Sequence, residues 1–302
     1  MKKLFTLASL LVLASLVLSA CGGGAAKADN VLDDVMNRGY ILISTDPNYA
    51  PQSFLDTTAK RPEDTKCPSD ALTTAEMQGF DVDVAKAIGD ALKVETCFAT
   101  PGWDLLTAGN WVDKWDMSVG SMTITTDRRK VLDFSVPYYY TPARIAVQAD
   151  SEFTSLDELA GQNLCAGTST TYETWLNGGD LGSEITILAK APAVTVVTLD
   201  SDQECAQALQ AGRTDFVGYV TSATVIYANL IEGFPVKFLG DAIYYEPLAA
   251  AFDKSSSLPT ATLVAEVDKL FSQMHSDGTL TKLSLKWFKN EKDEGVDYTI
   301  AK

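Results

Sequence analysis

Residues 117–139 read MSVGSMTITTDRRKVLDFSVPYY, and this stretch is the most informative part of the chain. A strand-like run ends there in hydroxyl residues at alternate positions, and a turn that carries Arg128 follows. The alternation predicts that the Ser121 and Thr123 side chains lie on the same side of the chain. An arginine beside hydroxyl groups can pair bidentately with a carboxylate. A capped turn with a solvated arginine would give the same pattern.

Short apolar segments alternate with helical patterns on both sides of this stretch. Such alternation predicts α/β lobes with largely parallel sheets. Strands are expected at 40–44, 93–99, 117–120, 163–166, 195–199 and 216–220. Helices are expected from Phe80, from the capping boxes at 155–158 and 201–204, over 260–276 and over 280–288.

The first twenty residues have the pattern of an export signal. Lys2 and Lys3 precede an apolar run at 4–18 that is too short to span a bilayer comfortably. Cys21 follows Leu-Ser-Ala, which matches the lipobox of bacterial lipoproteins; an ordinary secretory signal with an incidental cysteine is the alternative. The sequence thus predicts a signal peptide at 1–20, lipidation of Cys21 and a flexible tether at 21–30. The domain would be anchored outside the cytoplasm, in the periplasm or at the cell surface.

The formal net charge of the chain is −16, and loss of the two lysines in the signal peptide makes it more negative still. A surface this acidic disfavours nucleic acids and anionic lipids as partners. We expect a solvated acidic surface that aids solubility.

Residues for covalent or metal chemistry are scarce. The only histidine, His275, falls late in a long helix and is expected to be exposed, and neither phosphate-loop motif is present. We therefore expect no catalytic residue, no metal and no cofactor. Four cysteines remain besides Cys21, and an even number in an oxidising compartment suggests two disulfides with three possible pairings. Four free thiols are the alternative for Cys67, Cys97, Cys165 and Cys205.

The stretch at 117–139 resembles the signature of the family 3 extracellular solute-binding proteins, the polar amino acid receptors of ABC importers. Further segments resemble the same family in the same order: 44–51 (STDPNYAP), 79–85 (GFDVDVA), 276–280 (SDGTL) and 286–288 (KWF). The resemblance implies a two-lobed, periplasmic-binding-protein-like fold of type II. It also implies a monomeric receptor that closes around an amino acid or similar small carboxylate and delivers it to an ABC permease.

The resemblance also implies how the chain is divided. Lobe 1 would contain 31–140 and 244–302, lobe 2 would contain 141–243, and the hinge would lie near 140–145 and 241–245. A bridge between lobes would obstruct closure. The disulfide pairs expected on this architecture are Cys67–Cys97 and Cys165–Cys205, each inside one lobe.

Several binding roles follow from the resemblance in lobe 1. The arginine at the position of Arg128 grips the ligand carboxylate in this family, with help from hydroxyls or amides at Ser121 and Thr123. Side chains that match Tyr49 and Trp103 sandwich the body of the ligand.

The second lobe would contribute the loop 167–171 (GTSTT), which resembles the Gly-Thr-Thr loop of the family. It precedes a helix, so its free N–H groups would face the cleft and could hold a carboxylate. We expect Ser169 to contact the ligand, with Thr170 next.

One departure concerns the ligand ammonium. The aspartate that binds it in the family falls here on Val220 or, with one insertion, on Thr221. Burying an ammonium without a counter-charge is costly. Either the ligand has no ammonium or another acid takes the role, and the candidates are Glu246, Asp46 and Glu173.

Two other function classes fit the same fold. Some relatives are dehydratases of cyclic amino acid precursors, for which Glu173 or Glu246 could serve as the general acid. A ligand-binding sensor domain without a transporter is the other class. The lipobox and the importer-type signature favour the receptor.

Overall fold

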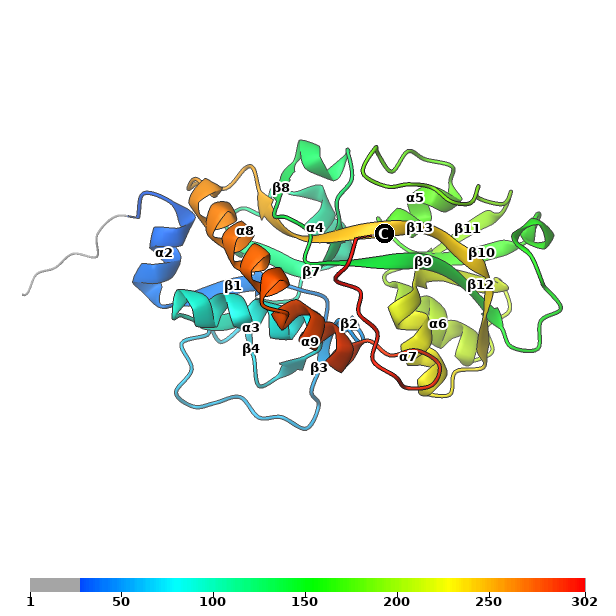
Figure 1. Cartoon of the computed structure of the whole chain (residues 1–302), viewed down its shortest axis with the longest axis horizontal. Helices are drawn as coiled ribbons and strands as arrows, with labels where there is room; N and C mark the ends of the chain where they lie inside the picture. Colours follow the sequence, from blue (N-terminus) through cyan, green and yellow to red (C-terminus); the bar gives the residue numbers. More distant parts are fainter. Residues whose placement is uncertain (1–27, 302) are drawn as a thin grey trace, which may run out of the picture.

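A computed structural model describes residues 28–301, so the predicted signal peptide and Cys21 lie outside the described residues. Two α/β lobes lie side by side along the long axis of the molecule (Figure 1). They are joined by two long antiparallel strands, β9 (Tyr139–Gln148) and β13 (Val236–Asp253). These strands enter the sheets of both lobes, which makes a single continuous sheet of ten strands. The predicted α/β fold class is confirmed.

The sheet of the first lobe runs in the order β4 (Leu72–Thr73), β6 (Glu95–Ala99), β1 (Tyr40–Ser44), β7 (Met117–Thr123) and β13, with β8 (Leu132–Phe134) paired to the end of β13. Strand β1 is parallel to both of its neighbours, whereas β13 is antiparallel to β7. A second, small sheet is formed by β2 (Asn48–Tyr49), β3 (Ser53–Leu55) and β5 (Met77–Gln78).

The core of the first lobe is centred on Phe80, at the start of α3 (Phe80–Leu92). Its ring packs against three other buried rings, those of Tyr138, Tyr139 and Phe288. Apolar residues at helical spacing on α3 complete this face, as the sequence pattern predicts. The other helices of the lobe are α2 (Val31–Arg38), α4 (Trp103–Ala108), the 3₁₀ turn η2 (Arg128–Lys130), α8 (Ala261–Ser276) and α9 (Thr279–Trp287).

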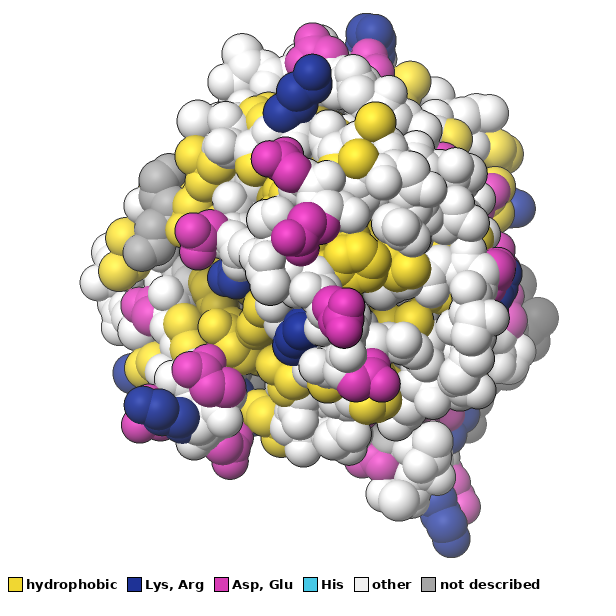
Figure 2. Space-filling view, turned by 90° about the vertical axis from the view of Figure 1, so that its right-hand side faces the viewer, with side chains coloured by type: hydrophobic (Ala, Val, Ile, Leu, Met, Phe, Trp, Pro, Cys, Tyr) yellow, Lys and Arg dark blue, Asp and Glu magenta, His cyan; other side chains and the backbone are white. Residues whose placement is uncertain are grey.

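The second lobe repeats this plan around the other ends of the long strands. Its sheet runs β11 (Thr195–Leu199), β10 (Asn163–Gly167), β12 (Gly218–Ser222), β9 and β13. Its helices are η3 (Leu156–Leu159), α5 (Thr171–Leu176), α6 (Asp202–Gln210) and α7 (Ala223–Ile231). Figure 2 looks onto the end of this lobe, where acidic and a few basic side chains are scattered and hydrophobic side chains gather near the middle of the face.

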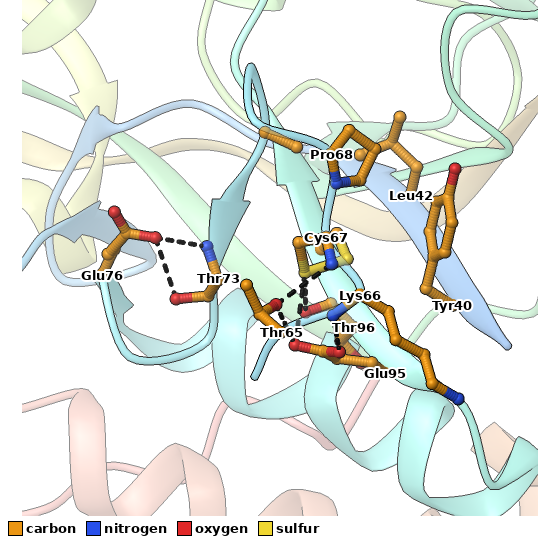
Figure 3. Close-up of a disulfide and its surroundings, with 12 residues drawn as sticks. Tyr40, Leu42, Thr65, Lys66, Cys67, Pro68, Thr73, Glu76, Glu95 and Thr96 are labelled. Atoms are coloured by element: carbon orange, nitrogen blue, oxygen red, sulfur yellow. Dashed lines mark hydrogen bonds between the residues drawn. A yellow bond between two sulfur atoms is a disulfide. The ribbon is translucent and has the colours of Figure 1, made fainter. Parts of the chain in front are cut away.

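Both predicted disulfides are present. Cys67 is bonded to Cys97 and Cys165 to Cys205, with Cα atoms 5.4 Å and 5.8 Å apart. The first ties the long 56–76 segment to β6. Figure 3 shows a second attachment beside it, where Glu95 accepts hydrogen bonds from the Thr65 hydroxyl and, at 2.6 Å, from the Lys66 amide. The second bridge joins β10 to α6.

Several local expectations were wrong. Strand β6 begins at Glu95 rather than at 93, because Lys93 ends α3 with a left-handed backbone, and β7 continues to Thr123 rather than 120. His275 is half-buried rather than exposed, because its Nε2 lies 2.9 Å from the Pro137 carbonyl oxygen. Strand β12 begins at Gly218 and ends at Ser222, two residues later than expected at each end. The shift follows from pairing, since Gly218–Ser222 align with Val147–Ala143 of β9.

Candidate binding site between the lobes

A cavity lies between the lobes and takes its walls from both. Its volume, including the part open to solvent, is about 470 Å³. We call it the interlobe cavity, and it is lined by Asp46, Tyr49, Trp103, Gly120, Ser121, Thr123, Arg128, Thr170, Thr171, Tyr172, Asp200, Ser201, Asp202 and Glu246. The sequence singled out eight of these: Asp46, Tyr49, Trp103, Ser121, Thr123, Arg128, Thr170 and Glu246.

Arg128 is the only lysine or arginine in the cavity lining. It is 7% exposed, and its guanidinium donates to the carbonyl oxygens of Thr123, at 2.9 Å, and Ser169, at 3.1 Å. The guanidinium also lies over the Trp103 ring, 5.4 Å from its centroid. Burial lowers the pKa of Arg128 to about 10, and the nearby Glu246 carboxylate opposes part of that shift. The group stays protonated at neutral pH, with three side-chain N–H groups left for a ligand.

Two serines beside the arginine have left-handed backbones, which is uncommon for residues other than glycine. Ser121 has φ 55°. Its amide donates a hydrogen bond to the Tyr138 hydroxyl, at 3.0 Å, and its hydroxyl donates one to the Asp81 carboxylate, at 2.6 Å. Ser169 in the second lobe has φ 61°. Backbone strain of this kind concentrates at ligand sites, where the surrounding contacts hold it in place.

The loop at 167–171 meets the first lobe through its backbone. The Ser169 carbonyl oxygen accepts from both Arg128 and the indole N–H of Trp103, the latter at 3.3 Å. The Ser169 amide donates to Glu173, at 2.7 Å, so it is not a free donor. Thr170 lines the cavity whereas Ser169 and Glu173 do not. Direct contact between Ser169 and a ligand stays a prediction.

Glu246 lies on β13 where the lobes meet, and it is 1% exposed. Its carboxylate accepts three hydroxyl hydrogen bonds: one from Thr123 of the first lobe, and one each from Thr171 and Tyr172 of the second, at 2.8 Å and 2.7 Å. Burial raises the pKa of Glu246, against the lowering effect of these donors and of Arg128. This acid therefore holds the two lobes together through neutral partners.

Asp202 was missed by sequence reasoning. It is 4% exposed, at the first position of α6, and accepts from the Gly167 amide, at 2.7 Å, and the Thr221 hydroxyl, at 3.1 Å. Gly167 permits this approach, because a Cβ atom there would lie 2.7 Å from Asp202 Oδ1. Burial raises the pKa of Asp202 to about 7. In sequence the residue is an ordinary acid in a helix first turn, a common feature.

The structure places Val220 and Thr221, where the family aspartate was expected, outside the cavity lining. Val220 is fully buried in the second-lobe core, and the Thr221 hydroxyl is covered by Asp202. Asp46, one of the suggested replacements, does line the cavity, and its carboxylate accepts from the Asn48 amide at 2.8 Å. Burial raises the pKa of Asp46 as well.

Other contacts hold the lobes together around the cavity. The Gln52 side chain donates to the Thr224 hydroxyl at 2.7 Å in a buried contact, and Arg129 forms an exposed ion pair with Glu184 at 2.7 Å. Together with the hydrogen bond from Arg128 to the Ser169 carbonyl oxygen, these contacts join the two lobes in a closed arrangement.

Residues 41–290 match the family described as bacterial extracellular solute-binding proteins, family 3, and so cover most of the chain. This chain belongs to that family. The resemblance seen in the sequence is thus confirmed, and the residues around Arg128 lie in the middle of the matched region.

Two similar proteins are known from Escherichia coli and Bacillus subtilis. The L-cystine-binding protein TcyJ of Escherichia coli strain K12 is 27% identical over 262 residues, which is 86% of each chain. The ABC transporter glutamine-binding protein GlnH of Bacillus subtilis strain 168 is 27% identical over 300 residues, or 97% of this chain and all of its own.

Two solved structures are similar to this chain in fold. A mutant of the arginine-binding protein ArgBP from T. maritima has a TM-score of 0.68 at 23% identity, over 85% of this chain and 98% of its own. An ancestral amino acid-binding protein, described as a precursor of cyclohexadienyl dehydratase, has a TM-score of 0.66 at 29% identity, over 85% and 99%.

Residues 28–301 lack two features. No cluster of three or more His, Cys, Asp or Glu side chains in this part of the chain could hold a metal ion. None of the helices found there combines the length and the apolarity that a membrane span requires.

Proposed function

We propose that this family 3 protein is the extracytoplasmic receptor of an ABC importer and that it binds an amino acid in the interlobe cavity. The observation that carries the proposal is Arg128, a buried and protonated guanidinium that lines the interlobe cavity with donors to spare. A carboxylate is the natural partner of such a fork. Tyr49 and Trp103 offer flat surfaces to the body of the ligand.

We propose hinge closure as the mechanism. Lobe 1 (31–140 and 244–302) would bind the carboxylate, and lobe 2 (141–243) would then seal the cavity by bending at 140–145 and 241–245. In support, the pairing of β13 with β9 shifts register between Leu239 and Tyr244, beside the second of these segments. Hinges of this kind absorb backbone changes over a few residues. Ligand binding would favour the closed form, which the permease recognises.

A ligand screen tests the receptor function on the mature domain, a monomer in this proposal. We expect an L-amino acid to raise the melting temperature, because a ligand at one hundred times its dissociation constant stabilises the fold by about 2.7 kcal/mol. The same ligand should reduce the radius of gyration in small-angle X-ray scattering. Its D-enantiomer is the matched control. An amino acid that stabilises the protein without compacting it would rule out hinge closure.

We also propose that the mature chain is anchored by a lipid on Cys21. Two signals support this, the lipobox and the glycine-rich stretch that follows it. Cys21→Ser should move the protein from the membrane to the soluble fraction and abolish labelling with radioactive palmitate. Membrane association and labelling that survive the substitution would show that Cys21 is not the anchor.

A catalytic role is the second candidate, and Glu246 is the observation in its favour. A buried acid with a raised pKa can act as a general acid. Its three hydroxyl donors bridge the lobes, however, and this favours a structural role. Incubation with prephenate or arogenate separates the two, because a receptor leaves both unchanged.

A further inference from the structure

The interlobe cavity has an unbalanced set of charges. Four of its lining residues are acids and one is a base, so its net charge is −3 when all are ionised. The acids are Asp46, Asp200, Asp202 and Glu246, and the base is Arg128. A ligand that brought only a carboxylate to Arg128 would make this imbalance worse.

The buried Asp202 and Glu246 and the half-buried Asp46 have no cationic partner of their own. Across residues 28–301, no lysine, arginine or histidine lies within 4.0 Å of the carboxylates of Asp46, Asp202 or Glu246 to form an ion pair. Asp202 is instead close enough to Asp46 and Glu246 for both to raise its pKa, in addition to the effect of burial. Unpaired buried carboxylates are costly in a closed structure. A cation in the cavity would remove that cost.

The three acids differ in burial and in how much of their hydrogen-bonding capacity is used. Asp46 is only half-buried and accepts one donor, the Asn48 amide. Glu246 accepts three hydroxyl donors. Asp202 accepts only two donors, and both are neutral. Since a carboxylate has about four acceptor positions, Asp202 has room for an ammonium or guanidinium group.

Asp202 also occupies the right place in the second lobe. Its Oδ2 accepts from the hydroxyl of Thr221, one of the two positions where sequence comparison expects an ammonium-binding aspartate. The Asp202 carboxylate on α6 therefore lies beside Thr221 of β12, where the aspartate of the family is missing. It faces the cavity opposite a lobe that presents Arg128 and Asp46.

We infer that the ligand is an amino acid of net positive charge, and that Asp202 is the residue that binds its cationic nitrogen. The inference rests on the proposed receptor function and narrows it to dibasic amino acids. The ligand carboxylate pairs with Arg128, its two cationic groups are held by Asp46 and Asp202, and acidic amino acids are excluded.

Isothermal titration calorimetry on the mature wild-type domain tests the ligand class with shape-matched pairs. Arginine is compared with citrulline, which has a neutral ureido group in place of the guanidinium, and lysine with norleucine, which lacks the side-chain amine. The better cationic ligand should bind at least tenfold more tightly than its neutral partner, and glutamate should not bind. Equal or tighter binding of the neutral partners would overturn the inference and leave the receptor function standing. If no amino acid binds, both fall.

Asp202→Asn tests the residue, with Asp200→Asn as the matched control two positions away at the exposed mouth of the cavity. The first substitution should weaken the cationic ligand at least tenfold and reduce its preference over the neutral partner. The control should stay within about threefold. Unchanged affinity in Asp202→Asn, with loss in Asp46→Asn, would assign the role to Asp46 and overturn our assignment.

Thermal unfolding without ligand separates binding from a structural role. The folded pKa of Asp202, about 7, lies above its ordinary value of 3.8. Stability from this group is therefore lost as the pH rises through the folded pKa. At pH 8, Asp202→Asn should keep or raise the ligand-free melting temperature while it weakens binding. A lowered melting temperature together with unchanged selectivity would mean that Asp202 is structural.

Discussion

Arg128→Ala is expected to raise the dissociation constant for the amino acid ligand at least about a hundredfold. The substitution removes the buried cation that pairs with the ligand carboxylate. Truncating one partner of a buried, hydrogen-bonded charge pair costs roughly 2–5 kcal/mol, and each 1.4 kcal/mol is a factor of ten in affinity. It also removes the hydrogen bond to the Ser169 carbonyl oxygen, which joins the lobes. Calorimetric titration of the mature domain measures the effect.

Lys130→Ala is the matched control for this experiment. It also removes one positive charge from η2, but Lys130 is exposed and pairs only with the nearby Asp127. Such surface pairs contribute little, so the affinity should stay within about twofold. Arg128→Lys should give an intermediate loss, because lysine keeps the charge but not the planar fork. If Arg128→Ala bound the ligand as well as wild type, the carboxylate would have to be held elsewhere.

Removal of the second-lobe disulfide, by Cys165→Ala with Cys205→Ala, is expected to lower the free energy of unfolding by about 4 kcal/mol. The bridge closes a loop with a sequence separation of 40 residues. Its removal increases the conformational entropy of the unfolded chain by the amount that a loop of this length predicts. For a protein of this size the melting temperature should fall by roughly 7 °C. Denaturant unfolding and calorimetry without ligand measure both quantities.

The first-lobe disulfide provides the comparison. Its separation of 30 residues predicts a similar loss of stability for Cys67→Ala with Cys97→Ala. Ligand affinity should differ between the two variants, because only the second bridge fastens α6, which carries Asp202. Weaker binding is expected without the Cys165–Cys205 bridge and unchanged binding without the other. If loss of either bridge left the unfolding midpoint unchanged, the stabilising role of the disulfides would be wrong.

Much of the fold could be predicted because local and global patterns agree. Strand β1 and helix α3 have the expected bounds or start, since their apolar residues repeat at the period of the element. The disulfide pairing was predicted correctly from the family architecture, which places each pair in one lobe. The half-buried state of His275 depends on a contact with Pro137, 138 residues away along the chain. No local pattern reports such a contact.

The candidate site was only partly predictable. Arg128 stands in a distinctive motif, and the structure places it in the cavity. Asp202 looks in sequence like one of many helix-start acids, and its importance comes from its approach to Gly167 and Thr221 of two other strands. Tyr172 was overlooked for a similar reason, because its hydroxyl meets Glu246, 74 residues away. The ligand contacts and the lobe bounds stay predictions.

The oxygen of Ser169 that joins the lobes belongs to the peptide backbone. Every amino acid carries this atom, so substitutions at position 169 that tolerate the left-handed backbone can preserve the contact. Under the proposed mechanism, this feature separates the ability to close from the choice of ligand, which we assign to side chains such as Asp202 and Tyr49. A protein built in this way could acquire a new ligand by mutation and keep this contact between its lobes. The side chains of the cavity could therefore be redesigned for a biosensor while the hydrogen bonds to the Ser169 carbonyl oxygen are kept.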